Sequence, residues 1–75
     1  MFDTTLKNIA AYCAKNVWEY EERLGMALSK MDYFRMPLKI ADVGLYNDIA
    51  DAVDDYCNDY GLNADEVDIE EMILM

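Results

Sequence analysis

Histidine is absent from this 75-residue sequence, and glycine, proline and cysteine are scarce. Without histidine, one chain cannot form a Ser–His or Cys–His nucleophile pair, or the Glu-x-x-His pattern of di-iron bundles. The three glycines form no phosphate-binding loop, and Cys13 and Cys57 lie too far apart in sequence for a C-x-x-C metal or redox motif. We therefore expect no enzymatic activity, no cofactor and no metal site.

Lysine and arginine are absent from residues 40–75, which contain eleven acidic residues. All six basic residues lie in residues 1–39, where five acids nearly balance them, so the net charge of −10 comes from the second half. The scattered cations do not make a phosphate-binding surface, and the acidic half repels anionic lipids. The charge layout predicts no direct binding to nucleic acid or membranes, and it favours a basic protein partner.

Long apolar runs are also missing, since no stretch approaches 18 consecutive apolar residues. The first residues do not have the pattern of a secretory signal. We therefore expect a cytoplasmic protein in which Cys13 and Cys57 are reduced, buried, small hydrophobic side chains. The hydrophobic content of 55% is sufficient for the core of one small domain spanning residues 1–75.

Residues 43–60 have the clearest helical pattern in the chain. Asp42 is a good N-cap because its carboxylate can accept backbone N–H groups, and Gly61 followed by Leu62 fits a Schellman end. On a helical wheel the apolar positions share one arc of roughly 120°. These positions are Leu45, Tyr46, Ile49, Val53, Tyr56, Cys57 and Tyr60. We predict an amphipathic helix here.

An acidic stripe covers another face of this predicted helix. It consists of Asp48, Asp51, Asp54, Asp55 and Asp59. Like charges four residues apart each cost a few tenths of a kcal/mol, and no basic residue is close in sequence after Lys39. The stripe is therefore either a solvated face or a docking surface for a basic partner. Arg35 and Lys39 could also neutralise it from within the chain.

Residues 4–31 repeat apolar side chains at alternating spacings of four and three, which is the heptad pattern. The positions are Leu6, Ala10, Cys13, Val17, Tyr20, Leu24, Ala27 and Met31. Because the register continues across Gly25, we predict one long helix, continuous or bent at that glycine. Trp18 widens the apolar stripe and is expected in the core.

A helix over 4–31 would be roughly 40 Å long, longer than the second helix can cover. Part of its apolar stripe must then pack against other segments or against a second copy of the chain. Val17, Tyr20, Leu24 and Met31 form the predicted seam of a homodimer.

The remaining segments are shorter. Residues 32–41 contain Pro37 and several large apolar side chains, which favours a connection packed over the long helix. Overlapping capping boxes, Asn63 with Glu66 and Asp68 with Glu71, predict a turn at 63–67 and a short helix at about 69–74.

Together these patterns predict a small all-α fold resembling a helical hairpin, with a short third helix. The predicted function is a non-enzymatic acidic module that binds a basic protein. Its specific form is a nucleic-acid mimic, because carboxylates on successive helical turns lie about 5–6 Å apart, close to the phosphate spacing of about 6–7 Å. The alternative is a structural or oligomerisation module built on the heptad stripe, with acids that only provide solubility.

Overall fold

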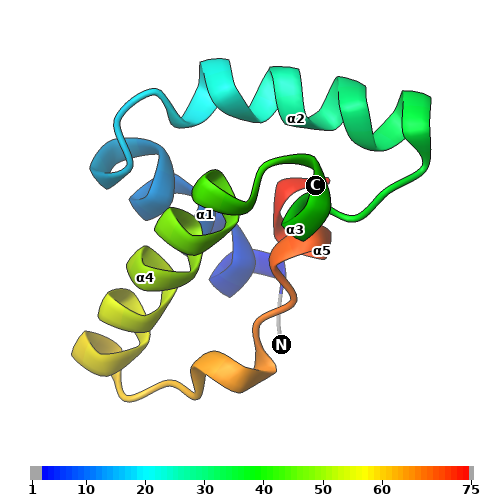
Figure 1. The fold of residues 1–75 in the computed structure, drawn as a ribbon. Helices are drawn as coiled ribbons and strands as arrows, with labels where there is room; N and C mark the ends of the chain where they lie inside the picture. The colour runs from blue at the N-terminus through cyan, green and yellow to red at the C-terminus, as the bar shows by residue number, and fades with distance from the viewer. Residues whose placement is uncertain (1–2, 75) are drawn as a thin grey trace.

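The computed structural model describes residues 3–74, which form helices and turns and no strand. The helices are α1 (Asp3–Asn16), α2 (Tyr20–Phe34), α3 (Leu38–Ala41), α4 (Val43–Tyr60) and α5 (Ile69–Ile73), with a 3-10 turn, η1 (Ala64–Glu66), between the last two. In Figure 1, α2 extends along one side of the molecule and the other helices lie beneath it. The prediction of a small all-α fold is confirmed.

The core is centred on α4, which buries more residues than any other helix. Its apolar face contacts α1, α2 and α3, and α5 closes the core by packing against α1. The buried cluster contains Leu6, Ile9, Cys13, Tyr20, Ala27, Leu38, Leu45, Ile49, Ala52, Val53, Cys57, Met72 and Ile73. Both cysteines are free and buried, as the sequence predicts.

The ends of α4 form as the sequence predicts. The Asp42 carboxylate accepts a hydrogen bond from the backbone N–H of Leu45 at 3.0 Å. Gly61 has a left-handed φ of 67°, and the N–H of Leu62 donates to the carbonyl oxygen of Cys57 at 2.8 Å. This last bond is the long-range bond of a Schellman end. The Asp42 cap fixes where α4 begins, and Gly61 fixes where it ends.

The prediction of a single long helix over residues 4–31 is wrong. The chain forms two helices, α1 and α2, joined by a turn at residues 17–19, in which Glu19 has a left-handed φ of 71°. The Asn16 side-chain amide donates to the carbonyl oxygen of Tyr12 at 2.8 Å, so this side chain folds back onto the last turn of α1. The break allows α2 to fold back, so that both helices bury an apolar face in one core.

The exposure of Trp18 corrects a second expectation. This side chain lies in the turn and is 81% exposed, whereas we expected it in the core. The helix also continues through Gly25, where neither a break nor a left-handed φ occurs. The break therefore occurs at the 17–19 turn and not at the glycine.

The predicted connection over 32–41 is only partly correct. Helix α2 continues to Phe34 and ends at Arg35, which has a left-handed φ of 53°, and Leu38–Ala41 forms α3. The end of the chain agrees better with the prediction. Asp68 caps α5 by accepting from the N–H of Glu71 at 3.2 Å, and Glu70 accepts from the N–H of Leu38 at 3.2 Å. The second bond joins α5 to α3.

Two glycine substitutions should change stability in opposite directions. Gly25→Ala should stabilise the fold by about 1 kcal/mol, because Gly25 lies inside a helix and an added Cβ would meet no atom within 4 Å. Gly61→Ala should destabilise it by about 1 kcal/mol, because φ is 67° there although space is open. Urea denaturation of both variants measures the difference. Equal shifts of the same sign would contradict the assignment of the break and the cap.

Candidate functional site

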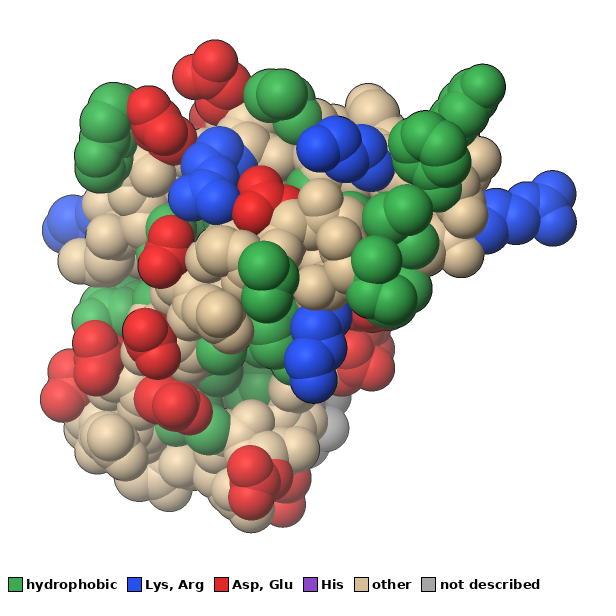
Figure 2. Space-filling model, in the orientation of Figure 1, with side chains coloured by type: hydrophobic (Ala, Val, Ile, Leu, Met, Phe, Trp, Pro, Cys, Tyr) green, Lys and Arg blue, Asp and Glu red, His purple; other side chains and the backbone are tan. Residues whose placement is uncertain are grey.

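The acidic stripe lies on the solvent side of α4. All five of its residues, Asp48, Asp51, Asp54, Asp55 and Asp59, are exposed. Figure 2 shows acidic side chains gathered over the lower left of the molecule, where Figure 1 places α4, whereas several Lys and Arg side chains lie above it and to the right. The lower left of this face in Figure 2 thus carries acidic side chains without basic ones, whereas acidic and basic side chains are mixed in its upper part.

Arg23 of α2 is the cation that contacts the beginning of this face. Its guanidinium lies 2.9 Å from an oxygen of Asp42 and 3.4 Å from an oxygen of Asp48. Within residues 3–74, the other four residues of the stripe form no ion pair. Sequence reasoning missed Arg23, because it lies 25 residues before Asp48. The stripe is therefore neutralised at one end only.

Arg35 and Lys39 do not neutralise the stripe, contrary to one alternative from the sequence. Neither side chain forms an ion pair with any residue in the described part of the chain. The Lys39 ammonium instead lies 5.9 Å from the centre of the Tyr46 ring, within the range of a cation–π contact. The short helix α3 places Lys39 at that ring.

An open hollow of about 480 Å³ lies between α1, the 17–19 turn and α4. We call it the α1–α4 hollow. Its carboxylate-bearing residues are Asp48, Asp51 and Asp55 of the stripe. Tyr12 and Ala52 also line it, together with the exposed Trp18. Acidic and aromatic groups thus share one concave surface.

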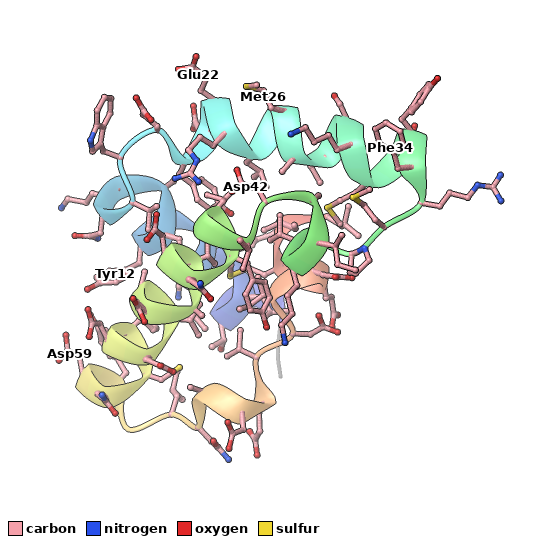
Figure 3. All side chains as sticks on the ribbon, viewed as in Figure 1. Tyr12, Glu22, Met26, Phe34, Asp42 and Asp59 are labelled. Atoms are coloured by element: carbon pink, nitrogen blue, oxygen red, sulfur yellow. The ribbon has the colours of Figure 1, made fainter. Side chains whose placement is uncertain are left out.

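Three tyrosines form a row beside the stripe. The ring centres of Tyr12 and Tyr56 are 5.4 Å apart, and those of Tyr56 and Tyr60 are 4.5 Å apart. Partial burial raises the pKa of Tyr12, and the nearby Asp55 and Asp59 carboxylates raise it further. Figure 3 shows Tyr12 and Asp59 on the same side of the molecule. The stripe is therefore bordered by aromatic side chains.

The residues of the predicted homodimer seam contact the core of their own chain. Tyr20 is buried, and Val17, Leu24 and Met31 are half-buried against the core cluster. Packing within the chain therefore accounts for their heptad spacing, and their role between copies stays a prediction.

Large apolar side chains are also exposed at the end of α2, on α3 and just after α5. Tyr33, Phe34, Ile40 and Leu74 are exposed there. We call these four residues the apolar end. The Tyr33 and Phe34 rings are 4.7 Å apart, and a groove lined by Met31, Met36 and Leu74 lies next to them.

Reactive groups are scarce in the described part of the chain. Burial raises the pKa of the Cys13 thiol to about 11, with a further contribution from Cys57, so this thiol is protonated at neutral pH. Burial also raises the pKa of Cys57. Among residues 3–74, no three side chains of the metal-binding types come together, and no helix is long and apolar enough to cross a membrane.

Comparisons of this chain with protein-family models, with curated proteins and with solved structures found no match.

Asp42 caps α4 and pairs with Arg23, so its removal should destabilise the protein. Asp42→Ala should lower the free energy of unfolding by about 1–2 kcal/mol, because the cap to Leu45 and the ion pair with Arg23 are both lost. Asp51→Ala is the matched control. It removes an exposed carboxylate from the middle of α4 and should be neutral or stabilising.

The effect of Asp42 should also depend on pH. The hydrogen bond from Leu45 lowers the pKa of Asp42, partial burial opposes this, and Arg23 lowers the pKa further. The folded state therefore binds this proton less well than the unfolded state. The contribution of Asp42 should be complete above its unfolded pKa and disappear as the pH falls through its folded pKa. Denaturation of wild type and Asp42→Ala between pH 7 and pH 2 would show the two curves converging in acid.

Proposed function

We propose that this chain is a non-catalytic module whose acidic stripe binds a basic protein. One observation carries the proposal: four exposed carboxylates on α4 lie within one stripe and are paired with no cation in the described residues. The stripe also weakens its own helix, because Asp51–Asp55 and Asp55–Asp59 repel each other at four-residue spacing. A basic partner would remove both the repulsion and the excess charge.

The specific form of this function is mimicry of a nucleic acid. Carboxylates on adjacent turns of α4 are spaced about 5–6 Å apart, close to the spacing of successive phosphates. A protein whose Lys and Arg side chains contact a phosphate backbone could contact the stripe with the same groups. The module would then inhibit that protein by occupying its groove. It needs no cofactor, and we place it in the cytoplasm.

Neutralising the stripe should abolish binding and leave the fold intact. The test variant is Asp51/Asp54/Asp55/Asp59→Asn, which retains the Asp48–Arg23 ion pair. The control variant is Glu21/Glu22→Gln with Asp65/Glu66→Asn/Gln, which changes net charge equally at exposed residues outside the stripe. Immobilised wild type should retain a DNA-binding protein from lysate at low salt and lose it at high salt. The stripe variant should retain none of it.

One further measurement separates mimicry from other acidic binding, and a second tests the repulsion within the stripe. Duplex DNA added to the purified complex should displace the module, because both would occupy one groove. The stripe variant should also unfold at a slightly higher temperature than wild type, because like-charge repulsion is removed. Equal retention of the basic protein by wild type and the stripe variant would refute the function. A ternary complex with DNA would refute mimicry alone.

The alternative function is self-association, and the apolar end is the observation that favours it. Its side chains are between 60% and 81% exposed. Lys30, Arg35 and Lys39 lie in the same segments, and no residue of the acidic stripe does. Under this alternative the heptad positions serve the internal core, and the second copy covers the apolar end.

Phe34→Asp should convert such a dimer to a monomer without unfolding it, because Phe34 is 60% exposed. Sedimentation equilibrium over a wide concentration range gives the mass of each form. Trp18→Asp, at an exposed aromatic residue outside the apolar end, is the control and should not change the mass. A monomer of the wild-type chain at every concentration would exclude this alternative.

A further inference from the structure

We draw no further inference here: the strongest candidate, the open apolar groove between the end of α2 and Leu74, has Lys30 and Arg35 next to its lining residues in the chain but also Asp32 in its wall, so its charge selects no partner and nothing in the structure shows what covers it.

Discussion

Burial of the apolar face of α4 is the interaction on which the rest of the structure depends. Leu45, Ile49 and Val53 are almost completely buried and lie on successive turns, so they contact several helices at once. Burying each such side chain is worth about 1.5–3 kcal/mol, whereas one like-charge pair on the other face costs a few tenths. Burial therefore outweighs repulsion several-fold. The helix can carry its acidic stripe because its other face is in the core.

Local signals were sufficient to predict α4, because every determinant of this helix is close in sequence. Asp42, the apolar arc and Gly61 all act within one helix length. The break between α1 and α2 has no such signal. Two helices that each bury one face, joined by a short turn, keep the same heptad spacing as one continuous helix. Only the three-dimensional core distinguishes the two arrangements, since it requires α2 to return over α4.

The candidate site, like the fold, could be predicted from the sequence only where it depends on a single helix. The positions of the carboxylates on α4 followed from helical periodicity, because they depend on one element. The cations that contact these carboxylates depend on how α2, α3 and α4 pack together, so helical periodicity could not predict them. Arg23 reaches from α2 to Asp42 and Asp48, and Lys39 instead lies over Tyr46 because α3 is helical. Lys39, which is close to the stripe in sequence, was therefore the wrong candidate, and the distant Arg23 pairs with the stripe.

The 17–19 turn accounts for both the core and the hollow. A left-handed residue other than glycine is strained, and Glu19 takes that conformation where α2 begins. The turn allows α2 to cover the core, and it also leaves Trp18 exposed. A large exposed indole, a strained residue and uncompensated charge each conflict with local stability. The strain at Glu19 is accounted for by the return of α2 over the core, and Glu19 does not line the α1–α4 hollow. Acids dispersed over the surface would provide solubility equally well, so their concentration on one face of α4 supports the binding role that we propose.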